Sequence, residues 1–205
     1  MTGIHQLFLG SPNSGIFSYE FDSSTSNDFQ EPAPVNIYYR RHIVQTVYTA
    51  SELSSYGARS GAKFVNLRWY ITDPVPEFNS ARGLNIRLFH TNTLDGTSDA
   101  FPISGESKTT VYFVDEISDV TEFETAGICQ FNFITTFSWN GINNICVEIC
   151  TSQNENDWLQ RGTQRVVYVT NGSRYDETDS VGSSCSDSLS AIIDFKPSVE
   201  MDFVF

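Results

Sequence analysis

KFVNLRWYIT, at residues Lys63–Thr72, alternates apolar with polar side chains. Val65, Leu67, Trp69 and Ile71 occupy every second position, and Asn66, Arg68 and Tyr70 stand between them. Successive side chains of a β-strand point to opposite faces of the sheet. The pattern therefore predicts a strand with one face in a core and one face toward water.

The same alternation recurs along the chain after Pro34, interrupted by turn residues. Aromatic residues make up 14% of the sequence and long helix-forming runs are missing, which favours β-structure. The sequence predicts an all-β fold over residues 37–205: a two-sheet antiparallel sandwich, jelly-roll-like. Further candidate strands lie at 41–48, 84–90, 109–114, 129–135, 144–150, 164–170, 190–195 and 199–205.

A short helix is expected at TASELSSYG, residues 49–57. Thr49 and Glu52 have the spacing of a capping box, in which each side chain bonds the other's backbone N–H. Gly57 supplies the left-handed residue that commonly ends a helix.

Residues 1–36 are predicted to form an extended N-terminal arm, because Ser, Asn, Asp and Pro are frequent there and no period is sustained. Single aromatic residues along it are spaced so that they could dock on the surface of a neighbouring subunit. An arm that packs on its own domain would show the same pattern. The candidate interface residues are Phe8, Phe17, Tyr19, Phe21, Phe29, Arg40 and Arg41.

The segment FSWNGINNICVEIC, residues 137–150, is predicted to be a hairpin turning at Asn140-Gly141. Cys146, Glu148 and Cys150 then share one strand face. Positions four apart on a strand are separated by about 13 Å, too far to share a zinc ion or a disulfide. We expect the four cysteines of the chain to be free thiols, as is usual without a signal peptide.

Several function classes are disfavoured by composition and motifs. The formal charge of −13 repels nucleic acid and anionic membranes, and no apolar run is long enough for a membrane span. Three scattered histidines form no metal motif, and neither a nucleophile elbow nor a phosphate loop is present. We expect no catalytic residues, no metal and no cofactor. The acidic segments 154–158 and 174–180 are interpreted as solvated loops in preference to calcium sites.

Aromatic residues beside polar ones suggest a second possibility. Trp139, Trp158 and Tyr175 have the chemistry of a platform on which a glycan stacks, if loops gather them at one end of the sandwich.

Three segments, RRHIVQTVYTASELSSYG, LNIRLFHT and FSWNGINNICVEIC, resemble in order and spacing a β-sandwich module of large bacterial surface proteins and viral structural proteins. The opening HQLFLGSP is also similar to the starts of viral structural proteins. The resemblance implies a non-enzymatic capsid-surface, vertex or fibre subunit of a virion. Such a protein is made in the host cytoplasm without a signal peptide and assembles with copies of itself and other virion proteins. The alternative is a carbohydrate- or receptor-binding module that contacts a host-surface glycan.

Overall fold

The computed structural model describes residues 13–19, 27–29, 41–73, 81–116, 126–153, 163–178, 185 and 188–205. Within these ranges the chain forms eleven strands and one short helix. The all-β prediction is confirmed, and every strand predicted from the sequence is present. The elements are β1 (Ser14–Tyr19), β2 (Asn27–Phe29), β3 (Arg41–Tyr48), α1 (Ala50–Ser55), β4 (Lys63–Asp73), β5 (Ala81–Thr91), β6 (Thr109–Glu116), β7 (Gly127–Ser138), β8 (Asn144–Gln153), β9 (Thr163–Thr178), β10 (Ala191–Pro197) and β11 (Val199–Val204).

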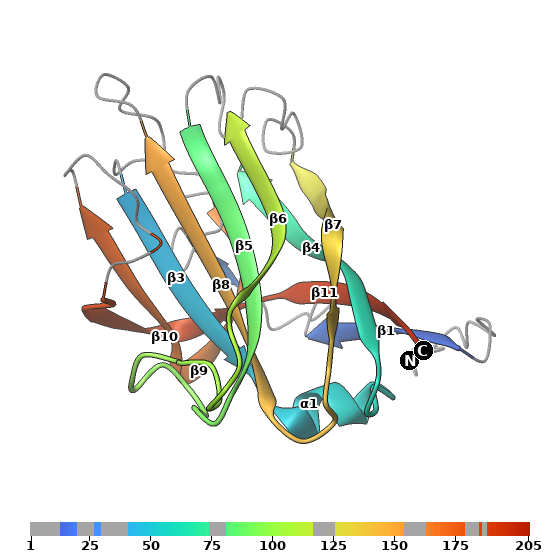
Figure 1. The fold of residues 1–205 in the computed structure, drawn as a ribbon. Coiled ribbons are helices and arrows are strands. Elements are labelled where there is room, and N and C mark those ends of the chain that lie inside the picture. Colours follow the sequence, from blue (N-terminus) through green and yellow to red (C-terminus); the bar gives the residue numbers. More distant parts are fainter. Residues whose placement is uncertain are drawn as a thin grey trace, which may run out of the picture.

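All strands belong to one antiparallel sheet that curls into two layers (Figure 1). The strand order is β1-β11-β4-β9-β3-β8-β5-β6, with β2 and β10 also on β9, and β7 on β4. The long strand β9 belongs to both layers. Its first residues pair with β4, and its residues 173–178 pair with β3. The sandwich is therefore continuous through β9.

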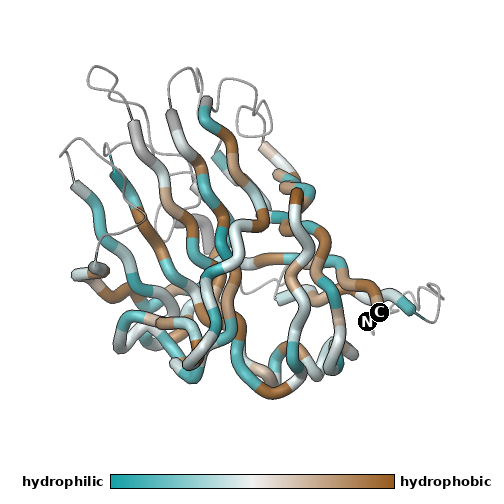
Figure 2. The backbone as a smooth tube through the Cα atoms, viewed as in Figure 1, coloured by the Kyte–Doolittle hydropathy of each residue, from teal (hydrophilic) through white to brown (hydrophobic). Residues whose placement is uncertain are grey.

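The main core fills the space between the two layers. Trp69 of β4 and Tyr112 of β6 both contact the ring of Phe131, with centroids 5.2 and 5.0 Å away. Figure 2 shows apolar and polar positions alternating along the strands, as the sequence pattern predicts. Burial of these apolar surfaces, at about 25 cal/mol per Å², is the main force that holds the layers together.

Strand β4 departs from the predicted alternation at its beginning. The register with β7 shifts between Phe64 and Asn66, which marks a bulge. Phe64 is fully buried in the core, whereas Val65, the predicted core residue, is only half-buried. Leu67, Trp69 and Ile71 face the core as predicted.

The predicted hairpin at residues 137–150 is wrong, although its turn is present. Gly141 has a φ of 78°, and Asn140 Oδ1 accepts hydrogen bonds from the backbone N–H groups of Ile142 and Asn143. The two strands that flank the turn pair with different partners: β7 with β4, and β8 with β3 and β5. The turn therefore connects the two layers of the sandwich.

The two faces of β8 are as predicted. Ile145, Val147 and Ile149 lie in the main core, and Cys146 and Cys150 lie in two smaller apolar clusters on the opposite face. Cys146 packs with Val47, Phe89 and Ala100, and Cys150 packs with Ile43 and Leu189, so this second face is also covered.

The expectation of free thiols is wrong for two of the four cysteines. Cys150 forms a disulfide with Cys185, with their Cα atoms 5.3 Å apart. The partner comes from a different part of the chain, which the spacing of Cys146 and Cys150 does not reveal. Cys129 and Cys146 are free and buried, as small apolar residues usually are.

The helix α1 is confirmed together with both of its end signals. Thr49 accepts a hydrogen bond from the Glu52 backbone, Glu52 accepts one from the Thr49 backbone, and Gly57 has a φ of 85°. Glu52 also forms an ion pair with Lys196, in which Oε1 lies 2.9 Å from Nζ. This ion pair ties the start of α1 to β10.

Candidate functional site

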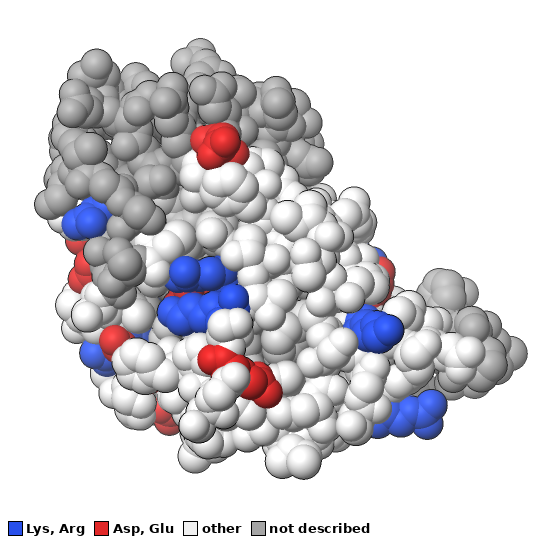
Figure 3. All heavy atoms as spheres, in the orientation of Figure 1, with Lys and Arg blue, Asp and Glu red and all other residues white. Residues whose placement is uncertain are grey.

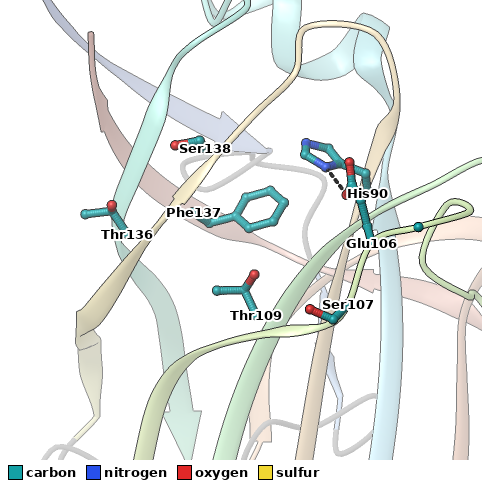
Figure 4. A pocket seen from close by; sticks show the side chains of 8 residues that line it. His90, Glu106, Ser107, Thr109, Thr136, Phe137 and Ser138 are labelled. Carbon is teal, nitrogen blue, oxygen red and sulfur yellow. Dashed lines mark hydrogen bonds and ion pairs between the residues drawn. The ribbon is translucent and has the colours of Figure 1, made fainter.

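A pocket of about 370 Å³ opens between the edge of one layer and the end of β7 from the other (Figure 4). It collects one histidine, one carboxylate, four hydroxyl groups, one aromatic ring and one glycine. The lining residues are His90, Gly105, Glu106, Ser107, Thr109, Thr136, Phe137 and Ser138.

Three separate segments build the pocket. His90 lies near the end of β5, and β6 pairs with β5 so that Thr109 stands opposite Leu88. The loop before β6 is fixed to this strand, because the Ile103 N–H donates to the His90 carbonyl at 3.0 Å. Thr136 and Ser138 come from β7, which reaches the pocket because it pairs with β4.

His90 is held by hydrogen bonds at both ring nitrogens. Nδ1 lies 2.6 Å from Glu106 Oε2, and Nε2 lies 3.1 Å from the Asn140 backbone nitrogen. Since a backbone N–H donates, Nε2 is the acceptor, and the bonding pattern assigns the ring proton to Nδ1. The ring also contacts that of Phe137, with centroids 4.8 Å apart. His90 is thus a fixed support for the Glu106 carboxylate.

The hydroxyl groups of the pocket are not used within the fold. Among the described residues, no side-chain hydrogen bond is made by Ser107, Thr109, Thr136 or Ser138. Figure 4 shows Phe137 projecting between the hydroxyl-bearing residues, with its ring toward His90. The arrangement offers hydroxyl donors and acceptors, one oriented carboxylate and a small apolar surface. These are the groups that recognise a small polar ligand.

Two cations close to the pocket in sequence, Lys108 and Arg87, bind a carboxylate that does not line it. Lys108 stands between Ser107 and Thr109, but its ammonium lies 2.6 Å from Glu148 on the other side. Arg87 also pairs with Glu148, a fully buried carboxylate. On the face drawn in Figure 3, Lys and Arg form small separate groups, and most of the described surface belongs to uncharged residues.

Of the three residues predicted to form a glycan platform, the structure describes Trp139 and Tyr175. Trp139 is 1% exposed, and its Nε1 donates to the Asn143 carbonyl at 2.7 Å. A ring buried in this way has no face for stacking, so Trp139 is a core residue. Tyr175 packs against the core from β9, and Trp158 lies outside the described residues.

The predicted interface residues are only partly described. Phe17 is fully buried in the core of its own chain, against Tyr48, because β1 pairs with β11. Tyr19 packs on the same core, and Arg41 is half-buried at the start of β3. This part of the predicted arm therefore lies on its own domain. Phe8, Phe21, Arg40 and the side chain of Phe29 lie outside the described residues, as does most of the range 1–36.

The segment 174–180 was predicted to be a loop, which is wrong for its first five residues. Arg174–Thr178 is the end of β9, and Arg174 pairs with Asp99 at 2.5 Å. Residues 179 and 180, and the other acidic segment at 154–158, lie outside the described residues. In the part of the chain that the structure describes, no three His, Cys, Asp or Glu residues gather as metal ligands. No helix in this part has the length and hydrophobicity of a membrane span.

Sequence reasoning missed every residue of the pocket. The polar loop GESKT, residues 105–109, carries four of them, but polar loops are common and give no specific signal. His90 sits within a predicted strand, and nothing in the sequence places it beside residues 106 or 137.

No protein family and no curated protein matches the sequence. Among solved structures, the chain is similar to a surface-layer-associated protein of Clostridium difficile with cysteine protease and lectin-like domains, at 7% identity and a TM-score of 0.47. It is also similar to the clostridial protease after propeptide cleavage, at 9% identity and a TM-score of 0.45. The chain is covered to 95% and 88% in these comparisons, but it spans only 37% and 40% of those longer chains. At this level of similarity the comparisons carry no argument about function.

Proposed function

We propose that this protein is a non-catalytic β-sandwich that binds carbohydrate in the pocket around Glu106. The observation that carries the proposal is the set of four hydroxyl groups and one carboxylate around the ring of Phe137. Phe137 is 5% exposed, so the match rests on the hydroxyl groups and the carboxylate, which suit the many hydroxyl groups of a sugar.

The state of His90 supports a binding role in preference to a catalytic one. A histidine that activates a serine needs a free ring nitrogen as its base. Both nitrogens of His90 are already engaged, by Glu106 and by the Asn140 backbone. Ser107 and Ser138 therefore have no activated base at this imidazole.

The disulfide supports a setting outside a reducing cytosol. Structural disulfides persist on cell surfaces, in secreted proteins and on virus particles. The Cys150–Cys185 bond fits any of these, and a surface protein that recognises glycans fits them too. The virion assembly role implied by the sequence resemblance stays a prediction. It has less support, because the described arm residue Phe17 is buried within its own fold.

A glycan array probed with the full chain tests the proposal. Thr136→Trp places a bulky side chain in the pocket, and Thr135→Trp is the matched control at the adjacent exposed position, which does not line the pocket. We expect the wild type and the control to retain the same neutral glycans and Thr136→Trp to lose them. Retention by all three proteins, or by none, would overturn the proposal.

A further inference from the structure

We infer that the pocket selects neutral sugars and rejects their acidic counterparts, with Glu106 as the residue that determines this choice. The inference rests on the proposed function and specifies its ligand class. It starts from the charges that line the pocket: Glu106 provides a carboxylate, and the other lining side chains carry hydroxyl groups, an aromatic ring or the His90 imidazole.

His90 does not neutralise this carboxylate. The imidazole gives its single proton to the bond with Glu106 Oε2, because Nε2 accepts from the Asn140 N–H. The pair therefore keeps the negative charge of the carboxylate. Among the described residues only His90 bonds the Glu106 side chain, which leaves Oε1 to accept a hydroxyl group from a ligand.

Two lysines lie near the lining residues: exposed Lys63 stands opposite Ser138 in the pairing of β4 with β7, and Lys108 stands between Ser107 and Thr109. The Lys108 side chain is engaged by a carboxylate that does not line the pocket. Its ammonium is bound to Glu148 and lies over the ring of Phe89, 5.2 Å from the centroid. The formal charge of −13 on the whole chain adds to the repulsion of an anion.

A neutral hexose meets favourable partners at the same place. A sugar hydroxyl donates to Glu106 Oε1, and hydrogen bonds to a charged acceptor are stronger than those between neutral groups. The hydroxyl groups of Ser107, Thr109, Thr136 and Ser138 then donate to or accept from other sugar oxygens. A sugar carboxylate in place of a hydroxymethyl group loses the donor and adds a like charge.

Isothermal titration of the full chain with matched ligands tests this inference. The ligands are methyl glucoside, galactoside and mannoside, each with its uronic acid counterpart. We expect at least one neutral sugar to bind about tenfold or more tightly than its acid. Glu106→Gln should narrow that ratio to about threefold or less, since the amide keeps an acceptor for His90 but carries no charge. Asp115→Asn removes the same charge from exposed β6 and should leave the ratio unchanged.

The outcomes distinguish a failure of the inference about Glu106 from a failure of the proposed carbohydrate binding. If the acids bind as tightly as the neutral sugars, or if both substitutions change the ratio equally, the inference about Glu106 is overturned while carbohydrate binding stands. If neither sugar type binds the full chain at the concentrations used, the proposed function fails, and the inference with it.

Discussion

Glu106 and His90 lie 2.6 Å apart, Oε2 to Nδ1, and join the loop before β6 to the end of β5. The same imidazole accepts the N–H of Asn140 from the turn that follows β7. One side chain therefore connects three segments that are distant in sequence. This connection fixes the carboxylate that we propose as the centre of the binding pocket.

Reduction of the Cys150–Cys185 disulfide should destabilise the fold. The bond closes a loop of 35 residues, and loops of this size contribute about 2–4 kcal/mol when crosslinked. We expect a reductant, or Cys150→Ser with Cys185→Ser, to lower the melting temperature measured by circular dichroism. The reductant should have no effect on the double variant. An unchanged wild-type melting temperature under reduction would contradict this account.

The free thiol of Cys146 should make stability depend on alkaline pH. Burial raises the pKa of this thiol, and the neighbouring Glu148 raises it further. The unfolded thiol ionises near pH 8.5, whereas the folded one keeps its proton. Stability from this group is therefore full below about pH 8.5 and falls as the pH rises, by up to about 1.4 kcal/mol per pH unit.

Urea unfolding at pH 7.5, 8.5 and 9.5 measures this effect. Tyr48 and Lys196 also have shifted pKa values, so the wild-type curve alone is not diagnostic. Cys146→Ala removes only the thiol, and we expect its loss of stability between pH 8.5 and 9.5 to be smaller than that of the wild type. If the free energy of unfolding falls equally with pH in the wild type and in Cys146→Ala, the Cys146 thiol is not the cause of the fall.

Glu52 should matter more than its position on a six-residue helix suggests. It completes the capping box with Thr49 and holds the Lys196 ammonium, whose pKa is lowered by burial. Glu52→Ala removes the side-chain bond that completes the capping box and leaves the buried Lys196 ammonium without its carboxylate. We expect a loss of about 2–4 kcal/mol in the free energy of unfolding.

Ser54→Ala on the exposed side of α1 provides the comparison and should change the free energy of unfolding by less than about 0.5 kcal/mol. Lys196→Met removes the buried charge together with its need for a partner, so it should cost less than Glu52→Ala. If Lys196→Met and Glu52→Ala lower the free energy of unfolding equally, the unpaired Lys196 charge is not the source of the loss in Glu52→Ala.

Gly141 and Gly57 allow the turn between the layers to be tested. Both have positive φ, which costs an alanine about 1–2 kcal/mol. A Cβ at Gly57 meets open space, but one at Gly141 lies 2.8 Å from the Ser60 backbone. We expect Gly141→Ala to lower the unfolding free energy by at least about 1 kcal/mol more than Gly57→Ala. Equal losses of unfolding free energy for the two variants in denaturant titrations would show that the turn at Gly141 does not pack against Ser60.

The strands were predictable because their signal is local. The run RHIVQTVY gives the bounds of β3, and the Thr49–Glu52 spacing gives the start of α1. Strand pairing is a different matter. Asn140-Gly141 specifies a tight turn, but it does not specify whether the flanking strands bond to each other or enter separate layers.

The pocket could not be predicted, because it too depends on which strands pair. Its lining depends on β7 bonding to β4, which brings Thr136 to the same pocket as Thr109. The disulfide likewise joins Cys150 to a residue beyond β9, and nothing in the sequence near Cys150 indicates that partner. Both features follow from contacts between distant segments.

The proposed carbohydrate site is tested most directly by mapping where a bound glycan perturbs the protein. The measurement is a ¹⁵N–¹H chemical-shift titration of the full chain with the best neutral glycan from the array. We predict saturable shifts concentrated at the backbone N–H groups of Gly105, Glu106, Ser107, Thr109 and Ser138. Shifts centred elsewhere on the sandwich, with these signals unmoved, would contradict the account.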